Sequence, residues 1–456
     1  MENRMAIVLA AGKGTRMKSK LHKVLHSLNG LTMIEHVIRA VKDCGADDIV
    51  TIVGYQADNV KQVIDGQTKF AYQEEQLGTG HAVQQAEEIL GSYSGNTIVV
   101  SGDTPLLTPE TLKALFEHHE ATHAKATILT AFAEDPTGYG RVIRNEKGHV
   151  NRIVEQKDAN DQEKNVQEIN TGTYIFDNQL LFESLKKVNN NNAQGEYYLP
   201  DVIQILQSRG EIVSAYMMED LSEAIGINDR VALAKATELL TQRINEKHMR
   251  NGVTFYHPAS TYIEVDVEIG SDTVIEGNLS IKGTTHIGHD CFIGQGSEIV
   301  DSQLADNVKI RQSVIEESII GSFSDVGPFG HLRPKSELGQ HVHIGNFVEV
   351  KKSIIGDNTK AGHLTYIGDA ELGKQINVGC GTIFVNYDGK HKHKSIIGDQ
   401  SFIGSGVSII SPVKVGQRAV LAADSSISED VPDEALAIAR SRQTNKLNYW
   451  QKFINK

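Results

Sequence analysis

A glycine-rich loop near the N-terminus is suited to bind an anion. Leu9-Ala10-Ala11-Gly12 runs into Lys13-Gly14-Thr15-Arg16 directly after an apolar segment, and Lys23 follows. Small residues after a strand let backbone N–H groups surround an anion. The loop matches neither the phosphate-loop pattern GxxxxGK[ST] nor the dinucleotide pattern GxGxxG, and alone it could be a plain turn. The two nearby cations, Arg16 and Lys23, favour a polyphosphate ligand.

Two oxygen-bearing residues are candidate metal ligands. Asp103 ends an apolar run, and Asn228 precedes a long stretch with helical spacing. A carboxylate and an amide oxygen suit Mg²⁺, which also takes ligands from substrate phosphates. Two structural alternatives stay open, because aspartate often caps turns and asparagine often caps helices.

A second group of polar residues lies in the C-terminal half. Arg333 and Lys351 are 18 residues apart, and His363 and Tyr366 follow. If 18 residues make one coil of a repeating fold, the two cations stack and can hold a phosphate together. Other histidines of this half are expected to face solvent without a role: His289, His331, His341 and His343.

The C-terminal half repeats every six residues. Val326, Leu332, Leu338, Ile344 and Val350 follow this period, and so does the series from Ile397 to Ile427. Neither a helix nor an alternating strand has a period of six, whereas a parallel β-helix does. Steps of five residues, expected to mark tighter corners, end at Leu304, Ile315, Ile320, Ile355 and Leu372. Such a solenoid can be scaffold only, so its function depends on particular side chains.

The N-terminal half alternates strands and helices, which predicts a mainly parallel sheet covered on both faces. The expected strands are Met5–Ala10, Ile49–Gly54 and Thr97–Ser101, and the expected helices are Met33–Cys44, His81–Leu90 and Pro109–His119. We expect three segments: a domain over 1–228, a linking helix over 229–251, and a β-helix with a tail over 252–456. Residues 385–394 interrupt the period and are expected to form a loop.

Composition limits the classes of function. The 456 residues carry a formal net charge of −13, which argues against an extended nucleic-acid-binding surface. Three scattered cysteines, Cys44, Cys291 and Cys380, favour reduced thiols in a cytoplasmic protein. No apolar segment reaches 18 residues, so no membrane span is expected.

The N-terminal motifs resemble those of the sugar-nucleotide pyrophosphorylases. The signature is Leu9-Ala10-Ala11-Gly12-Lys13-Gly14-Thr15-Arg16-Met17 with Lys23, although His22 departs from the usual residue. The resemblance implies that Gln73, Gly78 and Thr79 bind the uracil, and that Asp103 and Asn228 hold Mg²⁺. It also implies that Gly140, Glu155 and Asn170 bind the sugar.

Both halves together resemble the bacterial bifunctional N-acetylglucosamine-1-phosphate uridylyltransferase/glucosamine-1-phosphate acetyltransferase family. The C-terminal motifs are Lys360–Asp369, Asn377–Gly381 and Val385–Gly389, and the similarity spans nearly the whole chain. It implies a Rossmann-like nucleotidyltransferase domain, a linking helix and a left-handed β-helix that forms a homotrimer. The implied products are UDP-N-acetylglucosamine, a precursor of peptidoglycan and other envelope polymers, and pyrophosphate.

The resemblance also assigns residues to each step. His363 would be the general base, Arg16 and Lys23 the catalytic cations, and Arg333 and Lys351 the phosphate-binding pair. Tyr366 and Asn377 would bind the sugar, and acetyl-CoA would contact the following residues: Cys380, Asn386, Tyr387, Ser405, Ala423 and Arg440. The chain departs from the family pattern at Phe384, Gly406 and Asp424.

Three alternatives remain at this stage. Cys380 could carry the acetyl group covalently instead of contacting acetyl-CoA through its backbone. The solenoid could only oligomerise or regulate a pyrophosphorylase, or the chain could be a non-catalytic sensor of nucleotide sugars.

Overall fold

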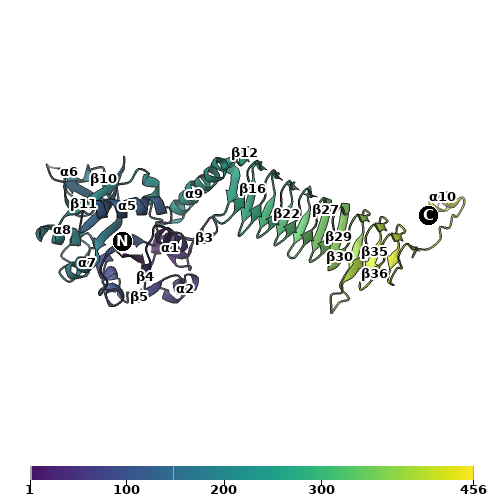
Figure 1. The fold of residues 1–456 in the computed structure, drawn as a ribbon, viewed down its shortest axis with the longest axis horizontal. Helices are drawn as coiled ribbons and strands as arrows, with labels where there is room; N and C mark the ends of the chain where they lie inside the picture. Colours follow the sequence, from purple (N-terminus) through teal and green to yellow (C-terminus); the bar gives the residue numbers. More distant parts are fainter. Residues whose placement is uncertain (1–2, 147, 455–456) are drawn as a thin grey trace. The chain divides into compact units, whose positions relative to one another are not determined.

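The computed structural model describes residues 3–146 and 148–454. The chain divides into two compact units between Leu240 and Thr241, and helix α9 (Arg230–Arg250) crosses this division (Figure 1). This division falls inside the linking helix predicted over 229–251. That 1–228 and 252–456 fold independently stays a prediction.

The first unit is built on a largely parallel sheet. Its strand order is β11-β7-β10-β6-β1-β4-β5; off this path, β8 pairs with β10 and β9 pairs with β8. The strands are β1 (Arg4–Ala10), β4 (Asp48–Val53), β5 (Lys69–Tyr72), β6 (Asn96–Ser101), β7 (Ala126–Phe132), β8 (Gly140–Arg144), β9 (Val150–Val154), β10 (Glu168–Asp177) and β11 (Val213–Met217). Strand β10 runs antiparallel to its neighbours β6 and β7, which the sequence pattern did not predict.

Helices cover both faces of this sheet. They include α1 (Met33–Asp43), α2 (Ala57–Val63), α3 (Thr79–Gln84), α4 (Glu87–Leu90), α5 (Pro109–Ala121), α6 (Asp161–Lys164), α7 (Asn178–Leu185) and α8 (Asp201–Ser208). Ala6 and Val8 of β1 point into one buried cluster, whereas Met5 and Ile7 point into the other. This alternation follows from the two-residue period of a strand and confirms a core on each face. The single helix predicted over His81–Leu90 is wrong, because the chain turns between α3 and α4.

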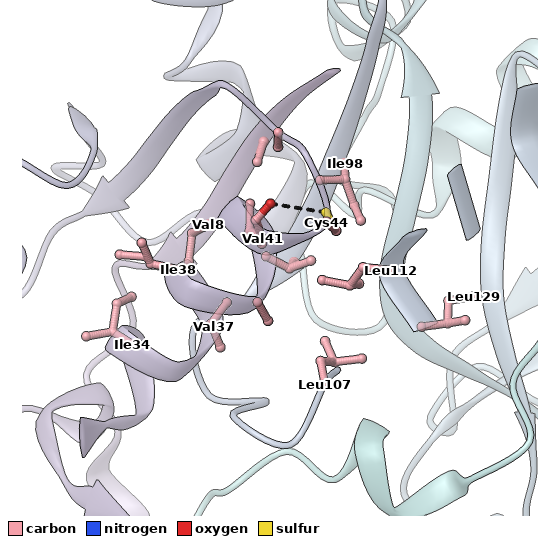
Figure 2. Close-up of a cluster of buried hydrophobic side chains, with 14 of the residues drawn as sticks. Val8, Ile34, Val37, Ile38, Val41, Cys44, Ile98, Leu107, Leu112 and Leu129 are labelled. Carbon is pink, nitrogen blue, oxygen red and sulfur yellow. Dashed lines mark hydrogen bonds between the residues drawn. The ribbon is translucent and has the colours of Figure 1, made fainter. Parts of the chain in front are cut away.

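Helix α1 forms much of one core cluster. A capping box between Thr32 and Glu35 fixes its start. Ile34, Val37, Ile38 and Val41 then pack on the sheet, beside Val8 and Ile98 (Figure 2). Cys44 closes the cluster, where its thiol donates to the Val41 carbonyl oxygen at 3.1 Å. Burial raises the pKa of this thiol to about 11, so Cys44 is a structural residue and not a reactive one.

The second unit is a solenoid of short parallel strands, visible as stacked arrows in Figure 1. Each strand pairs with one that lies a full coil away, as β25 (His331–Arg333) does with β27 (His343–Lys351), and β27 with β29 (Lys360–Gly368). Val326, Leu332, Leu338, Ile344 and Val350 are all buried, which confirms the six-residue period. The residues that end five-residue steps are equally buried: Leu304, Ile315, Ile320, Ile355 and Leu372. The left-handed sense stays a prediction.

The interruption of the period is a loop, as predicted. It lies between β32 (Ile383–Val385) and β33 (Ser395–Ile397) and protrudes from the stacked strands (Figure 1). Beyond β39 (Leu436–Ala437) the tail contains only the short helix α10 (Tyr449–Ile454) among its described residues. Within residues 3–146 and 148–454, no helix has both the length and the apolar character needed to cross a membrane.

One corner of the solenoid has a left-handed backbone on successive coils. The positive φ angles along this corner belong to Gly296, Gln312, Phe329, Phe347, Leu364, Gly381, Gly406 and Asp424. Such a corner needs a residue in the left-handed region, which glycine adopts most easily. The residue before each corner therefore occupies an equivalent place on its coil.

The first unit should lose stability in mild acid, partly because of His119. This buried side chain lies within hydrogen-bond distance of Thr127 Oγ1 (2.8 Å) and Asn96 Oδ1 (3.2 Å). Burial lowers its pKa from 6.5 to about 4. Between these values the unfolded chain binds a proton that the folded chain does not, so the free energy of unfolding falls as the pH falls. His119 alone should account for on the order of 3 kcal/mol.

Denaturant unfolding at pH 7 and pH 4.5, followed by circular dichroism, tests this prediction. The His119→Gln variant should lose less stability on acidification than the wild type does. His123→Gln is the matched control, because His123 is exposed at the end of the same helix. Equal pH dependence in the wild type and in both variants would contradict the assignment.

Candidate functional site

The glycine-rich loop follows β1 and positions a lysine. Gly14 has a φ of +58°, and a Cβ there would lie 2.5 Å from the Lys23 Cβ, so only glycine fits beside the lysine stem. Lys23 begins a short 3₁₀ turn, Lys23–Leu25, which His22 caps by accepting a hydrogen bond from Val24 N. Burial is the main reason that the pKa of His22 is lowered, so this cap is neutral at pH 7.

Four of the predicted residues meet at the end of the sheet. The Lys23 ammonium donates to Asp103 Oδ2 and, at 2.6 Å, to Asn228 Oδ1. Arg16 Nη2 donates to the same Asn228 oxygen at 2.8 Å. The other Asp103 oxygen accepts from Ser101 Oγ at 2.6 Å. Two oxygens and two cations from distant parts of the chain thus form one cluster.

The structural alternatives for Asp103 and Asn228 are not supported. Asp229, not Asn228, caps α9, because Asp229 Oδ1 accepts from Ala232 N at 2.8 Å. The Asn228 side chain is therefore available to the cluster. Both Asp103 oxygens bind side-chain donors, those of Ser101 and Lys23, which is unlike a carboxylate that caps a turn.

This cluster lines a cavity of about 390 Å³. Several predicted residues line it: Leu9, Ala10, Ala11, Gly12, Arg16, Lys23, Gln73, Gly78, Thr79, Asp103 and Asn228. Gln73 is buried, and its Nε2 donates to the Gly78 carbonyl at 3.1 Å. A Cβ on Gly78 would lie 2.6 Å from the Tyr197 carbonyl oxygen, so glycine is required there. Gln76 and Glu196 also line the cavity, and sequence analysis did not assign them a role.

The predicted sugar-binding residues form a separate group. Gly140 on β8 pairs with Asn170 on β10, and Glu155 Oε1 lies 3.1 Å from where a Gly140 Cβ would be. All three lie outside the residues that line the cavity. Burial, with the nearby carboxylates of Asp158 and Asp201, raises the pKa of Glu155. Because burial makes the charged form of the Glu155 carboxyl group costly, this group is suited to hydrogen bonding with the uncharged hydroxyls of a sugar.

In the second unit, cations gather as predicted and one more joins them. Arg333 and Lys351 are direct partners in the pairing of β25 with β27. Arg333 Nη1 also pairs with Glu349 Oε1 at 2.9 Å. The pKa of Lys351 is lowered, mainly by the neighbouring positive charge of Lys392 and to a smaller extent by that of Arg333. Three positive groups therefore converge here. Lys392 belongs to the loop that interrupts the repeat, where sequence spacing gave no indication of its partner.

His363 is exposed on β29 and has a partner that sequence analysis missed. Its Nδ1 lies 3.0 Å from Asn346 Oδ1, which pairs with it from the preceding coil. A carbonyl oxygen can only accept, so this contact places the imidazole proton on Nδ1 and leaves the Nε2 lone pair free. A free Nε2 is what a general base requires.

His363 belongs to a column of residues that each precede the left-handed corner. The column continues through Cys380, Ser405 and Ala423. Backbone hydrogen bonds tie its coils together, from Gly406 N to the Cys380 carbonyl and from Asp424 N to the Ser405 carbonyl, both at 2.8 Å. Successive coils are about 4.8 Å apart, so the column extends roughly 14 Å beyond His363.

The remaining predicted residues are only partly brought together. Asn386 Nδ2 contacts Tyr366 Oη at 3.4 Å and Asp369 Oδ2 at 2.6 Å. Three more predicted residues are exposed, and their roles stay predictions. Tyr387 lies on the loop, Asn377 on β31 (Asn377–Val378) and Arg440 in the tail. Phe384, which departs from the family pattern, is fully buried, so this departure affects the core of the solenoid.

No group of three or more histidine, cysteine, aspartate or glutamate side chains in the described part of the chain could hold a metal ion. The pair of Asp103 and Asn228 nevertheless fits a divalent ion, because both oxygens already converge on one cationic group. Mg²⁺ commonly takes one or two protein oxygens and completes its shell with water and substrate phosphates.

Comparison with known proteins agrees with this division into two sites. A nucleotidyl transferase family model matches residues 5–239, a GMPPB C-terminal domain model matches 259–355, and a hexapeptide repeat of succinyl-transferase matches 395–428. Proteins named bifunctional protein GlmU are similar over almost their whole length. Those of Enterococcus faecalis and Latilactobacillus sakei are 60% and 58% identical, each over 99% of this chain and 99% and 98% of their own. That of Listeria monocytogenes is 55% identical over 98% of both chains.

The fold and sites thus define a nucleotidyltransferase joined to a hexapeptide-repeat acyltransferase. More specifically, the chain belongs to the family of bifunctional GlmU proteins. It is an enzyme of UDP-N-acetylglucosamine synthesis with uridylyltransferase and acetyltransferase activities, and its substrates are nucleotides and sugar phosphates.

Proposed function

We propose that the second unit transfers the acetyl group of acetyl-CoA to glucosamine-1-phosphate, and that the first unit then joins the product to UTP. The second reaction forms UDP-N-acetylglucosamine and releases pyrophosphate. The nucleotide sugar would serve as a precursor of peptidoglycan and other envelope polymers, made in the cytoplasm.

The convergence of Lys23, Arg16, Asp103 and Asn228 in one cavity supports the uridylyl site most strongly. The sugar phosphate is already an anion at neutral pH, so its attack on the α-phosphorus of UTP needs no protein base. The chain supplies position and charge. Backbone N–H groups of the loop and the side chains of Arg16 and Lys23 would face the phosphates. Gln73 and the Gly78-Thr79 backbone would bind the uracil, and Gly140, Glu155 and Asn170 the sugar.

Asp103 and Asn228 would hold Mg²⁺. When bound, this ion neutralises charge on the substrate phosphates. Ser101 keeps one Asp103 oxygen occupied, so the other oxygen is the one that would bind the metal.

The acetyl site depends on the column and on the neighbouring cations. Arg333, Lys351 and Lys392 would bind the phosphate of glucosamine-1-phosphate, which neutralises their mutual repulsion. The sugar would lie against Tyr366, Asn377 and Asn386. His363 Nε2 would then accept a proton from the amine as the new N–C bond forms and the thioester C–S bond breaks. The CoA thiolate leaves.

The corner beside the column supports a place for acetyl-CoA. Phe329, Phe347 and Leu364 project side chains there on earlier coils, whereas Gly381 and Gly406 have none. The extended arm of acetyl-CoA would lie along the two coils of Gly381 and Gly406, past Cys380 and Ser405, and reach Ala423, where the corner residue Asp424 carries a side chain again. Tyr387 and Arg440 would contact its far end. Direct transfer needs only a base, so Cys380 need not carry the acetyl group.

We also propose a homotrimer. Phe329 and Phe347 stack their rings at 5.4 Å, and both are about half exposed, as is Leu364. An apolar ridge of this kind on a straight solenoid is suited to a contact between chains, and a closed trimer would cover it in every copy.

Single substitutions should separate the two activities. Asp103→Ala should abolish pyrophosphate release and leave CoA release near normal, because the metal position loses its only carboxylate. His363→Ala should do the reverse and lower acetyl transfer by roughly 10²- to 10⁴-fold, the usual contribution of a general base. Parallel assays of pyrophosphate and of free CoA thiol on each folded variant measure both effects. Loss of both activities in either variant would contradict two separate sites.

Asn346 should affect the pH profile of acetyl transfer. Asn346→Ala removes the acceptor for Nδ1–H, so the turnover rate should fall while uridylyl transfer is unchanged. Asn346→Asp places a carboxylate there, which favours the imidazolium and should move the acidic limb of the profile to higher pH. The matched control is Asn358→Asp, which is exposed at another corner of the solenoid. An unmoved acidic limb in Asn346→Asp would show that Asn346 does not position His363.

A further inference from the structure

The Lys23 ammonium lies at the position proposed for the metal ion. It contacts Asp103 Oδ2 and Asn228 Oδ1, the same two oxygens that would bind Mg²⁺. The pair is largely shielded from water, since the side chains of Lys23 and Asp103 are 13% and 17% exposed. An ammonium in this place neutralises the carboxylate much as a metal would.

The contacts around Asp103 restrict where the Lys23 ammonium or a metal ion can bind. Ser101 occupies Asp103 Oδ1, so Oδ2 is the oxygen directed toward the cluster. Magnesium–oxygen bonds are about 2.1 Å long, so an ion bound to Oδ2 and to Asn228 Oδ1 would overlap the ammonium. Two positive charges at that distance also repel each other strongly where water is excluded. The metal and the ammonium therefore cannot bind these oxygens together.

We infer that Lys23 is the counter-ion of this site in the free enzyme and gives way to the metal when nucleotide binds. The inference rests on the proposed function of Asp103 and Asn228 as metal ligands. Lysine is suited to this exchange, because its ammonium is a point charge on a flexible stem. The stem lies against Gly14, which offers no side chain to hold it. A phosphate in the loop attracts the ammonium away from Asp103 Oδ2 and from Asn228 Oδ1, and it also attracts the Arg16 guanidinium, which shares the Asn228 oxygen.

This exchange couples the two ligands. The metal alone binds weakly, because it must displace the ammonium from its hydrogen bonds. Nucleotide removes that competitor, so it should tighten metal binding, and by linkage the metal should tighten nucleotide binding equally. Lys23 thus acts before the reaction as well as during it, because it keeps the metal ion from binding to Asp103 and Asn228 in the absence of nucleotide.

Direct binding of Mn²⁺ to the full chain tests the inference without turnover. Free Mn²⁺ is measured by electron paramagnetic resonance, with and without UTP and with no sugar phosphate. Lys23→Met should bind Mn²⁺ alone roughly tenfold tighter than the wild type, within the usual range of coupling between sites. The enhancement by UTP should shrink to the same extent. Lys23→Ala should behave alike, which guards against an effect of the methionine side chain or of poor folding.

Lys13→Met is the matched control, because Lys13 is an exposed cation of the same loop and does not line the cavity. It removes the same charge and should leave Mn²⁺ affinity within twofold of the wild type. Equal affinities in the Lys23 and Lys13 variants would overturn the inference.

Asp103→Asn distinguishes failure of the inference from failure of the proposed metal site. This variant should weaken Mn²⁺ binding severely in the presence of UTP. If it does so while the Lys23 variants match the wild type, the metal site stands and the exchange is wrong. If Mn²⁺ binding with UTP is unchanged in Asp103→Asn, the proposed metal site itself is wrong.

Discussion

Parallel-strand register is the constraint on which both sites depend. In the second unit it places Asn346 beside His363 and Arg333 beside Lys351, although each pair is separated by a whole coil of sequence. In the first unit it brings the ends of β1 and β6 to one edge, where the glycine-rich loop meets Asp103. Side chains that lie far apart in the sequence are thereby held at a fixed spacing in both units.

Local charge, more than net charge, determines what these sites can bind. The chain carries −13 overall, yet cations gather at each candidate site. Lys23 and Arg16 share the oxygen of Asn228, and Lys351 lies among Lys392 and Arg333. In the absence of phosphate these cations compete with one another or pair with nearby oxygens. We propose that substrate phosphate relieves this arrangement, so that binding energy is directed to the reacting phosphates.

The sequence predicted the architecture, and its motifs contained the four residues that meet at the end of the first sheet, because periodicity and motifs are local. It did not predict partners that depend on exact coil length. A uniform coil of 18 residues would place Gly345 beside His363, but the five-residue step at Ile355 shortens this coil and brings Asn346 there instead. Lys392 lies in an inserted loop with no period to place it. For Asn228 the sequence left a helix cap open as an alternative to metal binding, and the structure shows that Asp229 takes the capping role.

The central claim is that acetyl-CoA lies beyond His363, along the corner where Gly381 and Gly406 carry no side chain. Gly381→Leu tests it, since Leu364 already adopts a positive φ at the same corner and a Cβ on Gly381 has room. Gly296→Leu is the matched control, on the same corner but on a coil before Arg333. Calorimetric titration with acetyl-CoA and with glucosamine-1-phosphate should show acetyl-CoA affinity reduced at least tenfold in Gly381→Leu only, with sugar-phosphate affinity unchanged. Wild-type acetyl-CoA affinity in a folded Gly381→Leu protein would contradict the claim.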